Sequence, residues 1–302
     1  MAHLHLPPSL HTAFLNDTVA PLLRAEGLWD HFFFLRYWQG GPHLRLRMLC
    51  GPGAGSAAAA ERVVAALARS LPEFDSGARE EYAYGLTLQA ELARLEQEEE
   101  TAGLPLGSVD RAPYAPEYRK YGGPQGVAIA ETVFRETSVA VLGLLAEQAA
   151  RGGTGQAPIG EAARIMAMFL RGAGLGPEAA IVFLREYEEW WRRYAPDTVR
   201  AAWPQLYRGV SPQLTNLCAA VWADSPPDDA FLATSAGATE RARAAAGTAP
   251  GGDVHDLRLA GTPYLGCLSN YIHTANNRLG LVPAHEGLVA HLVRRALEER
   301  AG

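Results

Sequence analysis

Residues 31–48 are the segment that most restricts the fold of this chain. Two apolar runs are joined there by a Gly-Gly-Pro turn, and the second run carries arginines at alternate positions. This pattern predicts a β-hairpin in which successive side chains point to opposite faces. One face of the second strand is apolar and comprises Leu44, Leu46 and Met48. The opposite face is polar and cationic and comprises His43, Arg45 and Arg47.

A row of cationic donors on a strand suits an acidic or carbonyl-rich ligand better than it suits packing. The alternative is an exposed edge strand whose charges prevent association with other chains, which is the usual role of an isolated Arg-x-Arg pattern. Two further motifs accompany the hairpin and favour the binding role.

The second motif is Tyr114–Gly123, which reads YAPEYRKYGG and is followed by a helical run through Phe134 and Ser138. The third is Ser269–Gly280, which reads SNYIHTANNRLG. Together with the hairpin, these segments resemble in order three blocks of the C-terminal domain of lantibiotic dehydratases, a family that includes stand-alone thiopeptide enzymes. The three blocks span nearly the whole chain, and their order and spacing make the resemblance specific.

Composition predicts an ordinary soluble protein with one domain, residues 1–302. Hydrophobic residues make up 48% of the 302 residues and charged residues 20%. Apolar stretches stay below the ~20 residues that a membrane span requires, and the N-terminus has no basic region followed by an apolar core. We therefore expect a cytoplasmic protein without membrane contact.

Charge and motif content also bear on partners and cofactors. The formal net charge of -6 argues against a broad nucleic-acid surface. The three cysteines form no Cys-x-x-Cys pair, and His3 and His5 lack evident companion ligands. Glycine-rich phosphate loops are absent from the sequence. We expect neither a metal nor another cofactor.

Strand patterns come first along the chain and long helical patterns follow, which predicts an α+β fold. We expect a small, mostly antiparallel sheet with several long helices, and the resemblance implies an elimination-domain-like arrangement. Residues 104–123 are predicted as an extended loop and 224–256 as a mobile surface excursion within the single domain.

The resemblance assigns candidate roles to individual residues. In the family, a histidine of the third block acts in elimination together with arginines of the first two blocks, which points to His273, Arg45 and Arg47. Tyr271 is the alternative proton carrier. A lone histidine in apolar surroundings is more often structural, so the role of His273 depends on the resemblance. Candidate substrate-binding residues are His43, Glu117, Lys120, Tyr121, Ser269 and Asn277.

The second block departs from the family pattern Glu-x-x-Arg-Tyr-Gly-Gly, because Lys120 stands at the arginine position. Lysine lacks the planar fork that holds a carboxylate bidentately. The Asp-Ser pair of the family is also replaced, by Thr137 and Ser138. Both departures weaken an assignment to glutamate elimination.

The resemblance then favours a thiopeptide pyridine synthase. Such an enzyme joins two dehydroalanines of a modified precursor peptide in a formal [4+2] cycloaddition, and loss of water and of the leader peptide completes the pyridine macrocycle. Two alternatives stay open: a split glutamate-elimination protein that makes dehydroalanine, and an inert leader-peptide-binding module. The expected partner is the precursor peptide with its leader, and a homodimer is left open.

Overall fold

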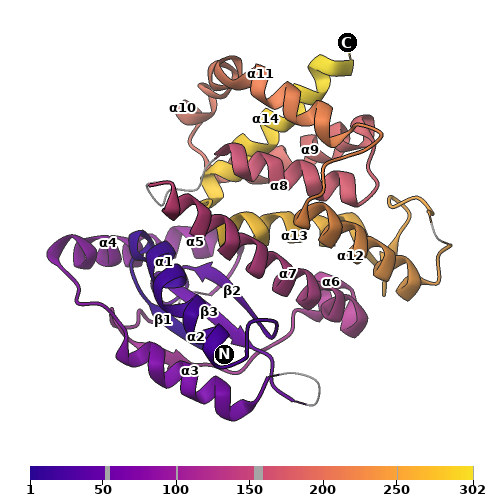
Figure 1. Ribbon diagram of the computed structural model, residues 1–302. Helices are drawn as coiled ribbons and strands as arrows, with labels where there is room; N and C mark the ends of the chain where they lie inside the picture. The colour runs from indigo at the N-terminus through magenta and orange to yellow at the C-terminus, as the bar shows by residue number, and fades with distance from the viewer. Residues whose placement is uncertain (52–54, 100, 153–158, 250, 302) are drawn as a thin grey trace. The chain divides into compact units, whose positions relative to one another are not determined.

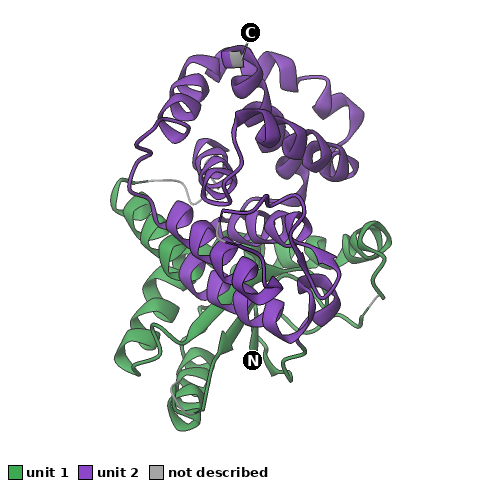
Figure 2. Cartoon of the chain, turned by 90° about the vertical axis from the view of Figure 1, so that its right-hand side faces the viewer, with its two compact units in different colours: residues 1–115, 138–156 green, residues 116–137, 157–302 purple. Residues whose placement is uncertain are grey.

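The computed structural model describes residues 1–51, 55–99, 101–152, 159–249 and 251–301 (Figure 1). Two compact units are distinguished by colour in Figure 2. Unit 1 comprises residues 1–115 and 138–156, and unit 2 comprises residues 116–137 and 157–302. Helix α7 (Gly123–Ala150) contributes its first half to unit 2 and its second half to unit 1. The single domain expected over residues 1–302 stays a prediction.

Unit 1 contains the antiparallel sheet that the sequence predicts. Its strands are β1 (Ala2–His5), β2 (Phe32–Tyr37), β3 (His43–Met48) and β4 (Val109–Arg111). They lie in the order β2-β3-β1-β4, and each neighbouring pair is antiparallel. Together with the long helices described below, this sheet confirms the α+β class.

The predicted hairpin forms as β2–β3, with Phe32 opposite Met48 and Tyr37 opposite His43. Leu44 and Leu46 are each only 1% exposed, so the predicted apolar face does enter the core. The connecting turn contains Gly40 and Gly41 at φ 83° and 104°. Side chains rarely adopt this left-handed region, which explains the glycine pair of the turn.

Strand β1, which carries His3 and His5, lies inside the sheet, because it pairs with β3 on one side and β4 on the other. One local expectation was wrong. The extended loop predicted for 104–123 contains β4 and a short helix, α6 (Tyr118–Tyr121). Strand β4 has only three residues and forms by pairing with a segment over a hundred positions away, which local patterns do not reveal.

Helices make up most of the rest of unit 1. The Ser138 hydroxyl, in the second half of α7, accepts a hydrogen bond of 3.2 Å from the backbone N–H of Phe34 on the edge strand β2. This contact satisfies an edge donor that would otherwise be unpaired.

The remaining helical elements of unit 1 are α1 (Pro8–Phe14), the π-helical turn η1 (Leu15–Val19), α2 (Ala20–Ala25), α3 (Ala57–Arg69), α4 (Ser76–Thr87) and α5 (Gln89–Glu96).

Unit 2 is a helical assembly around α8 (Ile159–Gly172), which is buried along most of its length and packs against four other helices. Those four are α11 (Trp203–Val221), α12 (Ala230–Ala246), α13 (Tyr264–Leu279) and α14 (Pro283–Ala301). Helix α9 (Pro177–Trp191) packs along α14. The smaller elements are the 3₁₀ turn η2 (Arg192–Tyr194), α10 (Asp197–Arg200), β5 (Arg258–Leu259) and β6 (Thr262–Pro263).

The prediction of a mobile surface excursion at residues 224–256 was wrong for the central part of that segment. Residues 230–246 form α12. Asp229 precedes this helix and caps it, because its carboxylate accepts from the backbone N–H groups of Phe231 and Leu232. Phe231, Ala238 and Ala242 are buried. Alanine-rich helix formers and a capping aspartate favour a helix that packs closely against α8. Residue 250 lies outside the described residues.

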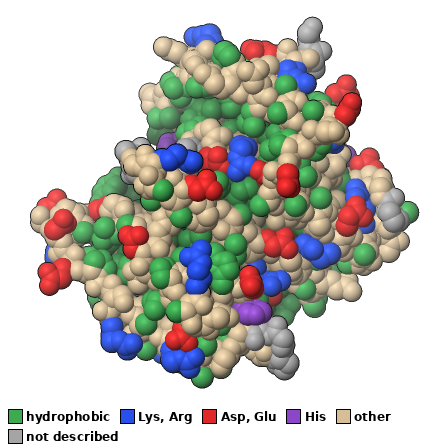
Figure 3. All heavy atoms as spheres, in the orientation of Figure 1, with side chains coloured by type: hydrophobic (Ala, Val, Ile, Leu, Met, Phe, Trp, Pro, Cys, Tyr) green, Lys and Arg blue, Asp and Glu red, His purple; other side chains and the backbone are tan. Residues whose placement is uncertain are grey.

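On the face shown in Figure 3, basic and acidic side chains are interspersed, in keeping with a modest net charge of -6. Among the described residues, no helix is both long and apolar enough to cross a membrane.

Candidate functional site

Helix α13 carries the third sequence motif. Its half-exposed residues Ser269, His273 and Asn277 recur every fourth position, which places them along one side of the helix. Tyr271 and Arg278 belong to the buried side. The motif therefore presents a polar stripe with His273 at its centre.

His273 is paired with a buried carboxylate. Its Nδ1 lies 3.0 Å from Oε1 of Glu286, in the first turn of α14. The His273 side chain is 26% exposed, whereas Glu286 is fully buried. Because the carboxylate accepts a hydrogen bond from Nδ1–H, a neutral His273 has its lone pair on Nε2. This arrangement is suited to a general base or acid.

Glu286 is held in place by two further donors. The Tyr187 hydroxyl lies 2.8 Å and the Asn276 amide nitrogen 3.0 Å from its Oε2. Burial and the neighbouring Glu286 charge raise the pKa of Tyr187 well above its usual range, so the phenol remains a donor. The position at a helix N-terminus also favours a negative charge on Glu286.

The ring of His273 is fixed by an aromatic neighbour. It stacks on Trp191, the last residue of α9, with ring centroids 4.5 Å apart and an interplanar angle of 29°. The carboxylate and the indole thus determine both the tautomer and the orientation of this imidazole.

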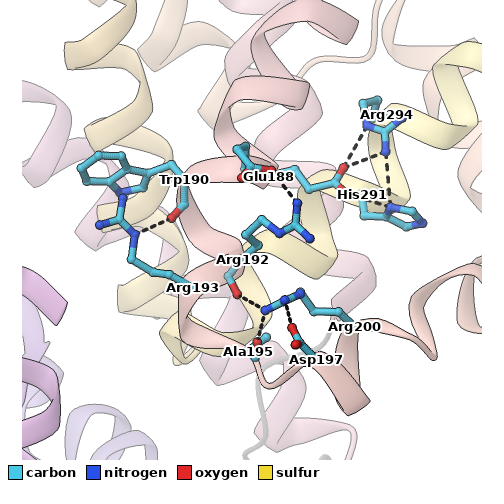
Figure 4. Close-up of polar contacts among 10 residues, drawn as sticks. Glu188, Trp190, Arg192, Arg193, Ala195, Asp197, Arg200, His291 and Arg294 are labelled. Carbon is cyan, nitrogen blue, oxygen red and sulfur yellow. Dashed lines mark hydrogen bonds and ion pairs between the residues drawn. The ribbon is translucent and has the colours of Figure 1, made fainter.

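The helices that supply these neighbours are connected by an ionic network, shown in Figure 4. Glu188 of α9 accepts from Nδ1 of His291 at 3.1 Å and from Nε of Arg294 at 2.9 Å, both on α14. Burial raises the pKa of Glu188, but the hydrogen bonds from His291 and Arg294 outweigh burial and hold it below its usual value. The network locks the helix of Trp191 to the helix of Glu286.

Tyr271 is a poorer candidate for proton transfer than the sequence suggests. It is fully buried, and its ring stacks on that of Tyr121 at 5.9 Å with an interplanar angle of 5°. Burial raises the pKa of Tyr271 well above its usual range. Tyr121 is itself only 2% exposed. Both tyrosines belong to an aromatic cluster in the core of unit 2, which does not fit a role in contacting a peptide.

The second motif places its charged residues on the surface. Lys120 Nζ lies 3.4 Å from Glu117 Oε1, and their side chains are 37% and 53% exposed. Thr137, which stands where the family has an acid, is fully buried and donates to the carbonyl of Val133 at 2.7 Å. The Lys120 ammonium has a carboxylate of the same chain beside it, and this position does not form a carboxylate clamp.

The cationic face of unit 1 is built on aromatic rings. The guanidinium carbon of Arg45 lies 3.4 Å from the ring centre of Tyr37, and that of Arg47 lies 4.6 Å from the ring centre of Tyr114. Phe33, opposite Arg47 on β2, is a second ring neighbour at 5.3 Å. Stacking of this kind orients the planar guanidinium group.

His43 lies on the same face but is fully buried. This burial does not fit the predicted contact with substrate. Its Nδ1 is 2.7 Å from the carbonyl oxygen of Gly41, and its Nε2 is 3.1 Å from Nε of Arg45.

The predicted residues thus form one group in each unit. Unit 2 holds those of α13, of α6 and of the residue that precedes α6, namely Glu117, Lys120, Tyr121, Ser269, Tyr271, His273 and Asn277. Unit 1 holds His43, Arg45 and Arg47 on β3. Sequence patterns missed Glu286, Tyr187 and Trp191. The one local signal for Glu286 is its position as an acidic residue in the first turn of α14, and such residues are common.

Metal binding has no obvious location in the described parts of the chain. No three His, Cys, Asp or Glu side chains among those residues are grouped closely enough to hold a metal ion. The expectation of a cofactor-free protein stays a prediction.

A model of the family described as "Lantibiotic biosynthesis dehydratase C-term" matches residues 1–297. The chain belongs to this family. All three motifs therefore lie within one family domain, as their resemblance indicates. A comparison with curated proteins finds no match.

Solved structures show that the fold of this lantibiotic dehydratase C-terminal domain is shared. The pyridine synthase TbtD from thiomuracin biosynthesis is 21% identical, with a TM-score of 0.69 over 99% of this chain and 97% of its own. TsrL is 19% identical, with a TM-score of 0.60 and coverage of 99% and 94%. The tRNA-dependent lantibiotic dehydratase MibB from Microbispora sp. 107891 is 22% identical, with a TM-score of 0.55. The match covers 99% of this chain but 28% of MibB.

Proposed function

We propose that the chain is a thiopeptide pyridine synthase acting on a modified precursor peptide that carries its leader. The observation that carries this proposal is the His273–Glu286 pair, a half-exposed imidazole whose tautomer is set by a buried carboxylate. The family and the fold similarity to TbtD support the substrate class.

The proposed reaction requires proton movement rather than an external oxidant. One backbone amide adopts its imidic form, and two dehydroalanines then join through two new carbon–carbon bonds. The former amide oxygen leaves as water, and the leader leaves as a carboxamide, which gives the aromatic ring. Each stage moves a proton to or from a carbon, nitrogen or oxygen atom of the peptide, and a neutral His273 is equipped to do so through Nε2.

Arg45 and Arg47 are proposed to bind carbonyl or carboxylate groups of the peptide. Their guanidinium groups are oriented by aromatic rings, which reduces the entropy lost on binding. Ser269 and Asn277, on either side of His273 along α13, are proposed to contact the peptide backbone.

Glutamate elimination is the competing function, and the two stacked arginines would also suit a glutamyl carboxylate. The surroundings of Lys120 and Thr137 favour the synthase, because neither position supplies the group typical of eliminating relatives. A catalytically inert leader-binding module is the third candidate.

The proposal is tested with a synthetic peptide that carries a leader, azoles and two dehydroalanines, followed by mass spectrometry. We expect a macrocyclic pyridine and a free leader carboxamide. Loss of glutamate from a glutamylated peptide would instead identify an eliminating enzyme. Binding of the leader without conversion of either peptide would identify the inert module.

Substitution of His273 separates catalysis from peptide binding. We expect His273→Phe to slow conversion by ~10²–10⁴-fold, the usual contribution of a positioned acid or base, with leader affinity nearly unchanged. His255→Gln, at an exposed histidine of the same unit, is the control and should convert peptide at the wild-type rate. A loss of affinity equal to the loss of turnover would assign His273 to peptide binding.

A further inference from the structure

The contacts of His43 define its protonation state. A carbonyl oxygen can only accept, so the 2.7 Å contact with Gly41 requires a proton on Nδ1. The Nε–H of Arg45 can only donate, so the 3.1 Å contact with Nε2 requires a lone pair there. Only the neutral Nδ1–H tautomer satisfies both bonds. Burial, the largest influence, lowers the pKa of His43 to about 2, which keeps the ring neutral.

The imidazole of His43 is also fixed in orientation. It is fully buried, and it lies against the rings of His3 and His5 of β1, with centroids 4.7 Å away in each case. Tyr37 of β2 closes the other side at 5.7 Å with an interplanar angle of 63°. Because neighbouring strands contact the ring from both sides, His43 has little freedom to change rotamer.

The turn of the hairpin is part of the same arrangement. Gly41 has φ 104°, and a Cβ at this position would lie 2.9 Å from Cζ of Tyr82 and closer still to its hydroxyl. A larger residue would have to move both the turn and the carbonyl that orients His43. The Gly-Gly-Pro turn therefore sets the direction in which His43 presents Nε2.

From these contacts we infer that His43 is a positioning residue, which holds the guanidinium of Arg45 at Nε while Tyr37 supports its face. This inference rests on the proposed function, in which Arg45 binds the peptide, and it replaces the predicted role of His43 as a substrate ligand. Arginine binds carbonyl and carboxylate groups best when its planar group is already oriented. Arg47 is held differently, since its Nε lies 3.1 Å from the sulfur of Met1.

Two substitutions at position 43 separate the two bonds of the imidazole. In His43→Asn the amide nitrogen can replace Nδ1–H and donate to Gly41, but no acceptor reaches Arg45. In His43→Gln the amide oxygen can replace Nε2 as the acceptor for Arg45. We expect His43→Asn to lower peptide conversion about ten-fold or more, as loss of one charge-assisted hydrogen bond does. His43→Gln should recover a large part of the rate.

The matched control is His11→Asn. His11 is likewise buried in unit 1 and its Nε2 bonds the carbonyl of Leu6 at 3.0 Å, but it has no contact with Arg45 among the described interactions. The His11→Asn variant should be destabilised about as much as His43→Asn, but its folded form should convert peptide at the wild-type rate. Thermal unfolding identifies the temperature at which all variants are folded.

A spectroscopic readout tests the positioning without relying on activity. The Nε–H of Arg45, assigned by its loss in Arg45→Lys, should be protected from solvent exchange in ¹⁵N spectra of the wild type. Protection should disappear in His43→Asn, return in His43→Gln and persist in His11→Asn. An unchanged signal in His43→Asn would overturn the inference.

A double-mutant comparison separates this inference from the proposed function. If His43 acts through Arg45, His43→Asn should reduce conversion no further in an Arg45→Ala background. Independent, multiplying losses would overturn the positioning role. A wild-type rate in Arg45→Ala would reject Arg45 as a peptide ligand, and with it this part of the proposed function, while the spectra would still test the His43–Arg45 bond.

Discussion

At the scale of single residues, the pairing of His273 with Glu286 is the central feature. The imidazole is half-exposed, yet it is held by a carboxylate that is fully buried and satisfied by Tyr187 and Asn276. A buried carboxylate with three donors is costly to alter, because each donor then loses its partner. Such a group stabilises a positive charge on His273 during proton transfer.

We therefore expect Glu286→Gln to lower turnover by roughly 10²-fold, since the amide retains the shape of the side chain but not its charge. Single-turnover rates measured over a range of pH would check this. The double variant with His273→Phe should be no slower than His273→Phe alone. Additive losses would show that the two residues do not act as a unit.

The two arginines of β3 should differ in their contribution. Arg45→Ala and Arg47→Ala are expected to reduce peptide conversion unequally, because Arg45 is bonded to His43 whereas Arg47 contacts Met1 and Tyr114. Loss of one charge-assisted contact corresponds to a change of ~1.5–3 kcal/mol in the binding free energy or in the activation free energy. Steady-state kinetics and circular dichroism of both variants provide the test. Wild-type turnover in both folded variants would exclude this face from binding.

At the scale of helices and strands, close backbone approach accounts for the tight packing of α12 against α8 in unit 2. Gly172 ends α8, where a Cβ would lie 2.8 Å from Cβ of Ser235 on α12 and closer still to the carbonyl of Leu232. The absence of a side chain allows α12 to pack tightly against α8. This contact is part of why 230–246 is a core helix rather than an excursion.

Gly172→Ala is expected to lower the free energy of unfolding by about 1–3 kcal/mol, the usual cost of overpacking. Gly143→Ala is the matched control, because that glycine lies within α7 and a Cβ there would meet nothing within 4 Å. This variant should gain about 0.5–1 kcal/mol from helix propensity. Urea unfolding of both variants gives the comparison, and equal effects would contradict the close packing of α8 and α12.

At the scale of the whole molecule, two buried histidines predict that the folded protein loses stability at acidic pH. Burial lowers the pKa of His11 to about 3 and that of His43 to about 2, both in unit 1. In the unfolded chain a histidine titrates near 6.5. Below that pH the unfolded state binds protons that the folded state does not. The stability present above pH 6.5 is therefore lost as the pH falls toward the folded pKa values.

Each of these histidines should reduce the free energy of unfolding by about 1.4 kcal/mol per pH unit below 6.5. Urea unfolding at pH 7.5, 6.0 and 5.0 would measure this slope. His11→Gln should have a slope smaller by about 1.4 kcal/mol per pH unit. Equal slopes for the wild type and this variant would contradict the burial of a neutral His11.

The sequence alone determined those features that depend on neighbours along the chain. Alternation of side chains settled which face of β3 is apolar and which is cationic. The glycine turn and the order of the three motifs identified the hairpin and the family. The alternation is a periodicity within one strand, and local backbone geometry converts it directly into the direction of each side chain.

The tertiary structure decided what covers each face. A periodic sequence pattern indicates that one face of an element is buried, but it does not indicate which other element packs against that face. Only the fold showed β4 beside β1, α12 against α8, and His43 and Tyr271 enclosed by other rings. The same holds for Glu286, which lies on the next helix and reaches His273 because α13 and α14 pack together. The partner that makes His273 a candidate acid or base is thus a product of helix packing rather than of any local motif.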